Sequence, residues 1–148
     1  GTLIDHTGST GVEGGKLLFL DLDDLHSSQL VIATGAVAEF QNSSRDFNRF
    51  SATSIEGDGT FVKTGTGLLK TGNATNMFAH WNMTGGLIDV REGEFRADYQ
   101  DNNQVTGAWA NNKASMNVEA GAFVSMVGGN YISVDALTGS GTVQNINS

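Results

Sequence analysis

Apolar residues gather along the chain in short runs, and residues rich in Gly, Asn, Asp or Thr separate most of these runs. Short runs bounded in this way are typical of β-strands. No segment shows a convincing helical spacing of apolar residues, and residues 21–30, the best helix candidate, are interpreted as a strand end and a loop. We predict strands over 16–22, 30–34, 36–40, 49–53, 60–63, 67–70, 87–90, 94–97, 114–118, 122–126, 131–134 and 142–146.

The junctions between these runs indicate corners rather than hairpins. Asp58-Gly59 is the one dipeptide of the kind that closes a tight hairpin. Elsewhere an apolar-x-x-Gly-x-apolar pattern recurs, and glycine at such a bend reaches positive φ without steric cost. The pattern therefore predicts strands redirected at corners. Its three copies are Ile32/Gly35/Val37, Val90/Gly93/Phe95 and Val118/Gly121/Phe123.

Strands joined by corners, with self-similarity every 20 to 30 residues, predict a solenoid. We expect an all-β fold, a right-handed parallel β-helix of about six rungs, in one domain over residues 1–148 that belongs to a longer exported protein. The polar segments 41–48 and 99–113 are interpreted as lateral insertions. Interior ladders are predicted to contain Ile32, Val90, Phe95, Val118 and Phe123.

Composition excludes several classes of partner. The 148 residues carry a net charge of −8, with eight Lys and Arg scattered along the chain, so no basic stripe is available for nucleic acid or an anionic membrane. There is no cysteine, which excludes disulfides and thiolate metal sites. No apolar run is long enough to span a bilayer. We predict no nucleic-acid partner, no membrane insertion and no cofactor.

Residues 61–72 carry a Lys-Thr-Gly-x-Gly core at Lys63 to Gly67, followed by Thr71-Gly72. Thr84-Gly85-Gly86 forms a turn motif, and a Gly-x-Gly-Thr-apolar sequence occurs at both 57–61 and 139–143. This series, over residues 55 to 146, resembles the autotransporter-associated β-strand repeat of bacterial passenger domains. The repeat positions are Gly57, Gly59, Lys63, Gly65, Gly67, Gly72, Gly85, Gly86, Gly93, Gly121, Gly139 and Gly141.

The resemblance implies an extracellular or bacterial cell-surface location. We expect a structural or adhesive module without catalysis: a stalk, an adhesin segment or a filament subunit. Neither end of the chain has the pattern of a solenoid cap, so neighbouring β-helix segments or head-to-tail copies are the expected partners. Carbohydrate or a host surface would bind on the lateral insertions. The alternative is a polysaccharide-binding or polysaccharide-cleaving β-helix of the lyase or phage tailspike type.

Candidate chemistry is sparse. His6, His26 and His80 lack metal-ligand spacing, so we predict no metal site among them. The acidic cluster Asp21, Asp23 and Asp24 suits either Ca²⁺ or an ordinary solvated strand face. Carboxylates on neighbouring rungs could form a glycosidase pair, although we predict no catalytic residue. The residues considered for that pair are Asp89, Glu92, Glu94 and Glu119.

Aromatic side chains near the irregular segments offer the other route to function. Trp81, Tyr99 and Trp109 are the candidate ligand-binding residues, because sugar rings bind on flat apolar faces. For Trp81 the alternative is a core position, since it alternates with Phe78 and Met83.

Overall fold

The computed structural model describes residues 3–43, 49–51, 54–72, 79–97, 108–127 and 131–146. Within these ranges the chain forms 17 strands and no helix. The strands are β1 (Leu3–Asp5), β2 (Ser9–Val12), β3 (Lys16–Leu20), β4 (Asp24–His26), β5 (Gln29–Ile32), β6 (Val37–Gln41), β7 (Arg49–Ser51), β8 (Ser54–Gly57), β9 (Thr60–Thr64), β10 (Leu68–Lys70), β11 (His80–Met83), β12 (Leu87–Val90), β13 (Glu94–Ala97), β14 (Ser115–Val118), β15 (Phe123–Val127), β16 (Leu137–Gly139) and β17 (Thr142–Ile146).

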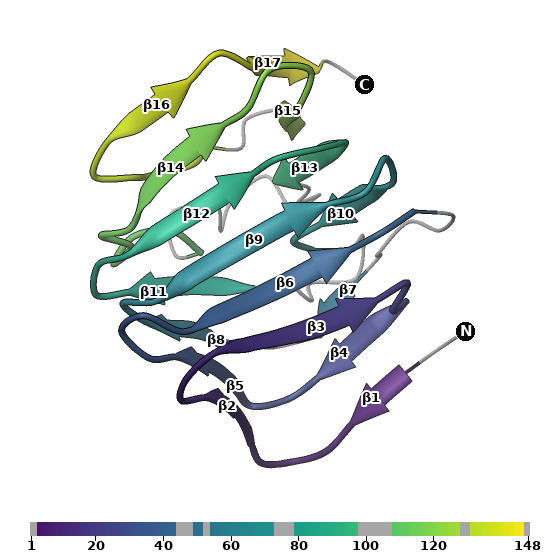
Figure 1. Cartoon of the computed structure of the whole chain (residues 1–148), viewed down its shortest axis with the longest axis vertical. Helices are drawn as coiled ribbons and strands as arrows, with labels where there is room; N and C mark the ends of the chain where they lie inside the picture. Colours follow the sequence, from purple (N-terminus) through teal and green to yellow (C-terminus); the bar gives the residue numbers. More distant parts are fainter. Residues whose placement is uncertain are drawn as a thin grey trace.

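The strands stack into a β-solenoid, and within the described residues all of the strand pairings are parallel. The chain winds through about five turns as a right-handed parallel β-helix, which confirms the predicted fold with about one rung fewer than expected. β1 to β3 lie at one end of the stack, and β16 and β17 lie at the other (Figure 1).

Three faces form the wall of the helix. The first face contains β1-β4-β7 and β10-β13-β15-β17, the second face contains β2-β5-β8-β11, and the third face contains β3-β6-β9-β12-β14-β16. On the third face Lys16 pairs with Val37, 21 residues further on, and Leu87 pairs with Ser115, 28 residues further on. The turns therefore differ in length while the wall stays in register.

The core is a set of ladders in which each buried side chain stacks on its register partner. On the third face one ladder contains Ala38, Phe61, Ile88 and Met116, all buried. Aromatic rings dominate the middle of the stack. Their centroids are 4.4 Å apart for Phe19–Phe40, 5.0 Å for Phe40–Phe61, 5.0 Å for Phe61–Trp81 and 4.7 Å for Trp81–Trp109.

The predicted strands were confirmed wherever alternation was clear. Strands over 87–90, 94–97 and 142–146 have the predicted bounds, and eight of the other nine predictions overlap a strand, with bounds that differ by up to two residues. The predicted strand at 131–134 is wrong, because those residues are irregular. Six strands of three or four residues were not predicted: β1, β2, β4, β8, β11 and β16.

The predicted ladder residues are buried except for one, Phe123, which is 41% exposed. Its register partner is Glu94, whereas Phe95 pairs with Val124. The cause lies at the corner before β15, where Ala122 is small enough to be buried and donates its N–H to the Glu119 carbonyl. This extra corner residue shifts the alternation by one position, which turns Phe123 outward and Val124 inward.

Glycines allow the close approach of successive rungs. Gly93 and Gly121 have positive φ at corners, as predicted, and the repeat position Gly65 also has positive φ, with Gly67 in the bend that follows it. At Gly86 an added Cβ would lie 2.1 Å from the Gly59 carbonyl oxygen of the rung below. The left-handed backbone conformation and this contact both require glycine.

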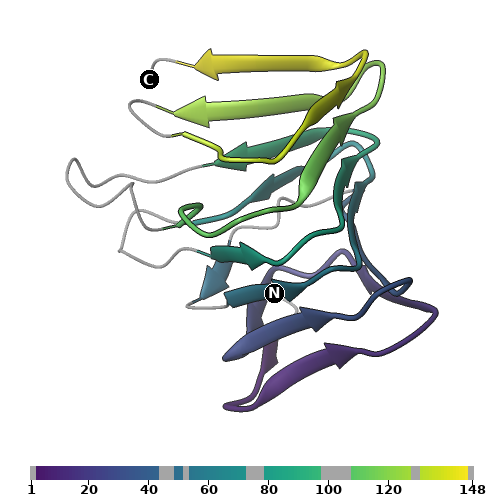
Figure 2. The same cartoon turned by 90° about the vertical axis from the view of Figure 1, so that its left-hand side faces the viewer.

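The second face has a turn above β11 instead of another strand. Trp81 donates its N–H to the Ala108 carbonyl at 2.6 Å, and Lys113 donates its N–H to the Met83 carbonyl at 2.9 Å. Between these two bonds the chain forms a turn closed by a hydrogen bond from Asn112 N–H to the Trp109 carbonyl at 3.1 Å. On the side of the wall viewed in Figure 2, a turn therefore lies above β11 in place of another strand.

Candidate functional site

The structure places two of the three candidate aromatic residues inside the core. Trp81 is fully buried and Trp109 is 2% exposed, with their rings stacked at an interplanar angle of 8°. The core interpretation of Trp81 is confirmed. Neither indole offers a face to a sugar in this structure, because each ring face is covered by neighbouring rungs. Tyr99 lies outside the described residues.

Lys63, a position of the predicted repeat, occupies an interior ladder between Phe40 and Val90. The side chain is fully buried. Its ammonium group donates hydrogen bonds to the carbonyls of Thr64 at 2.8 Å, Gly65 at 2.6 Å and Glu92 at 3.0 Å. An ammonium group has three donors, so all of them are satisfied. Lys63 thus joins the corner of its own rung to the corner of the next.

The charge of Lys63 makes stability depend on pH. Burial lowers the pKa of Lys63 to about 8, while the Glu92 carboxylate acts in the opposite direction. The unfolded chain, with a lysine pKa near 10.5, binds more protons between these values, so folding stability rises with pH across this window. We expect the free energy of unfolding of the wild type, minus that of Lys63→Met, to rise by up to about 3 kcal/mol from pH 8 to 10.5. Denaturant unfolding at a series of pH values measures this difference, and a flat difference would contradict the assignment.

Two of the four carboxylates considered for catalysis, Asp89 and Glu94, do not stack on another carboxylate. Asp89 pairs in register with Val62 and Asn117, and Glu94 pairs with Leu68 and Phe123. Each has a cationic partner on its own strand or at the corner: Arg91 lies 2.6 Å from Asp89, and Arg96 lies 2.8 Å from Glu94.

The electrostatics of Glu94 also oppose a role as a proton donor. Burial favours its neutral form, but hydrogen bonds from Arg96 and Ser125 outweigh burial, and the pKa of Glu94 lies below its ordinary value. A general acid needs a pKa raised toward the working pH. Asp89 and Glu94 therefore form ion pairs with neighbouring arginines rather than a facing acid and base.

The acidic cluster at 21–24 does not gather around a common point. The Asp21 carboxylate accepts a hydrogen bond from Ser43 N–H at 2.7 Å, and Asp24 lies 3.5 Å from His26. Across the described residues no group of three or more His, Asp or Glu side chains is placed to hold a metal ion. No helix in the same part of the chain has the length and apolar character needed to cross a membrane.

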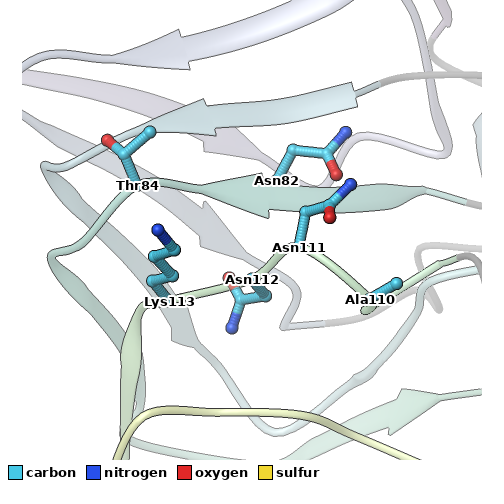
Figure 3. A pocket seen from close by; sticks show the side chains of 6 residues that line it. All are labelled: Asn82, Thr84, Ala110, Asn111, Asn112 and Lys113. Atoms are coloured by element: carbon cyan, nitrogen blue, oxygen red, sulfur yellow. The ribbon is translucent and has the colours of Figure 1, made fainter.

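A polar pocket opens on the second face between β11 and the turn at 109–112 (Figure 3). Its volume is about 470 Å³, which is within the range of small-molecule sites. Asn82 and Thr84 contribute from β11 and its end, and Asn111 and Lys113 contribute from the turn side. Sequence reasoning missed this pocket, because it brings together residues about 30 positions apart. The lining residues are Asn82, Thr84, Ala110, Asn111, Asn112 and Lys113.

The two ends of the solenoid carry a second unusual surface. Eight large apolar side chains are exposed in the described part of the chain, and seven of them lie on the terminal strands β1, β3, β16 and β17. Four occupy interior ladder positions whose stack ends there: Ile4 over Leu25, Leu17 over Ala38, Leu137 over Met116 and Val143 over Val124. One further rung at each end would bury them.

Comparison with known proteins adds no relative to this description. No protein-family model matches the chain, and no match is found among curated proteins or solved structures.

Proposed function

We propose that this chain is a non-catalytic structural module, a β-helix rod that extends by stacking head to tail on further copies of itself. The observation that carries the proposal is the concentration of exposed apolar ladder residues at both ends of the solenoid. Each end also presents strand edges that are paired on one side only within the described residues. Open edges with apolar ladders are templates for another β-rung.

The register of the third face supports a second copy as the occupant. β3 lies at one edge of this six-stranded sheet, β16 lies at the other, and all strands are parallel. Continuing the observed register places Leu17 of one copy over Leu137 of the next, and Phe19 over Gly139. Both contacts are apolar, with Leu17 on Leu137 and the Phe19 ring on Gly139, so neither buries an unpaired polar side chain. Such a heterologous contact does not close, so it builds a filament.

The proposed setting is extracellular or on a bacterial cell surface. This part of the proposal is supported by the resemblance of residues 55–146 to the repeats of autotransporter passenger domains. A stalk, an adhesin segment and a filament subunit all need a stiff rod whose neighbouring units pack through their ends.

Sedimentation velocity over a range of protein concentrations tests the stacking. We expect the wild type to associate as concentration rises. Leu137→Asp should remain monomeric, because a carboxylate at the end of an apolar ladder would be buried unpaired by the next copy. The matched control is Phe123→Asp, which introduces the same charge at an exposed apolar position on the side of the rod. A wild type that stays monomeric, or equal loss of association in both variants, would contradict the proposal.

A further inference from the structure

The pocket on the second face is an opening in the wall of the β-helix, formed by the way the backbone turns above β11. Within the described residues, the second face continues upward from β11 through two flanking backbone hydrogen bonds, at Trp81 and Met83. Between these two bonds the turn contains four residues, Trp109 to Asn112, whereas β11 contains only Asn82. Trp109 and Asn112 are buried under the turn, so Ala110 and Asn111 bulge outward and the gap above Asn82 stays open.

Lys113 gives the pocket its charge. It is exposed, and its ammonium group lies on the same side of the gap as Thr84 (Figure 3). Other basic side chains of the described residues have partners: Lys16 binds Glu39, Arg91 binds Asp89, and Arg96 binds Glu94. Among the residues that the structure describes, no carboxylate lines the pocket. Such a basic pocket is unusual in a chain with a net charge of −8, and it suits an anionic group of a ligand.

The remaining lining groups need a ligand that both donates and accepts hydrogen bonds. Asn82 donates its amide N–H to the Ser54 hydroxyl at 3.0 Å, which leaves its carbonyl oxygen as an acceptor toward the gap. Asn111 offers an exposed amide with both a donor and an acceptor. A fully ionised phosphate only accepts hydrogen bonds and would leave the carbonyl oxygens of Asn82 and Asn111 unpaired, whereas sugar hydroxyls both donate and accept.

We propose that this pocket binds a uronic acid residue of an acidic polysaccharide, with Lys113 pairing with the sugar carboxylate and Asn82 and Asn111 bonding its hydroxyls. A charge-assisted hydrogen bond to Lys113 supplies the larger part of the affinity, because such bonds are stronger than neutral ones. The site lies on the side of the rod, away from the ends, so this proposal does not depend on stacking.

Isothermal titration calorimetry with a trigalacturonate probe tests the site, with the neutral galactose trisaccharide as the matched ligand. We expect the wild type to bind trigalacturonate at least about tenfold more tightly than the neutral sugar, as expected for one charged hydrogen bond. Lys113→Gln should reduce the affinity for trigalacturonate to that for the neutral sugar. Asn82→Ala should weaken both ligands, since it removes a hydroxyl contact.

Lys70→Gln is the charge control, because it removes the same charge from β10 on the first face. It should bind trigalacturonate like the wild type. The proposal is overturned if trigalacturonate does not bind, if Lys113→Gln binds it unchanged, or if Lys70→Gln loses as much affinity as Lys113→Gln. Equal binding of an oligoglutamate peptide would also overturn it, because a carboxylate alone would then be sufficient. Thermal unfolding of each variant confirms that the fold is retained.

Discussion

Replacing Phe61 by alanine is expected to lower the free energy of unfolding by about 3 to 5 kcal/mol. Phe61 is fully buried, and its ring contacts those of Phe40, Phe50, Trp81 and Phe95 at centroid distances of 5.0 to 6.4 Å. Truncation therefore removes the centre of the aromatic stack and leaves a cavity that the rigid rungs on either side cannot fill. Urea unfolding followed by tryptophan fluorescence measures the change.

Phe123→Ala is the matched control for this prediction. It makes the same chemical change on a ring that lies on the outside of β15. We expect a loss of less than about 1 kcal/mol, as for surface positions in general. Similar losses in the two variants would show that the alternation along β15, and with it the placement of Phe123, is wrong.

Gly86→Ala is expected to destabilise the chain by about 2 to 5 kcal/mol, from two separate causes. The backbone at Gly86 has a φ of 80°, a conformation that costs an L-residue about 1 to 2 kcal/mol. The added Cβ would also meet the carbonyl oxygen of Gly59 in the rung below. Relieving that contact requires two rungs to separate, which adds the cost of overpacking, about 1 to 3 kcal/mol.

Gly35→Ala separates these two causes. Gly35 has nearly the same backbone conformation, with a φ of 76°, but an added Cβ there has nothing within 4 Å. We expect it to lose only the conformational part, about 1 to 2 kcal/mol. Chemical denaturation of both variants gives the comparison. If the Gly35 variant is destabilised as much as the Gly86 variant, close packing of successive rungs is not what requires glycine at position 86.

Local sequence was sufficient to predict the architecture. The glycine-marked corners and the alternation within strands are both properties of a few adjacent residues, and β12, β13 and β17 have the predicted bounds. Alternation alone also predicted the burial of Ile32, Val90 and Phe95. Strands β4 and β8 were missed because each contains a single buried apolar residue, Leu25 or Ile55, so the sequence shows no alternation there.

What the sequence did not show depends on contacts between rungs. Val90 to Phe95 and Val118 to Phe123 have the same spacing, but Glu94 is unsuited to burial at a corner whereas Ala122 is buried there. The identity of that one residue decides the register of the next strand. The polar pocket was missed for a related reason, since a turn at 109–112 opens space over residues of the previous rung only once the rungs are stacked.

Cross-linking between engineered cysteines tests head-to-tail stacking most directly, because the natural chain has no cysteine. Continuing the register of the third face places Leu18 of one copy beside Thr138 of the next, with both side chains on the outside of the sheet. Adjacent strands lie about 4.8 Å apart, within reach of a disulfide or a short bis-maleimide. We predict that a mixture of Leu18→Cys and Thr138→Cys chains forms covalent dimers, while either variant alone does not. Absence of the mixed dimer, or equal dimer formation by one variant alone, would contradict the account.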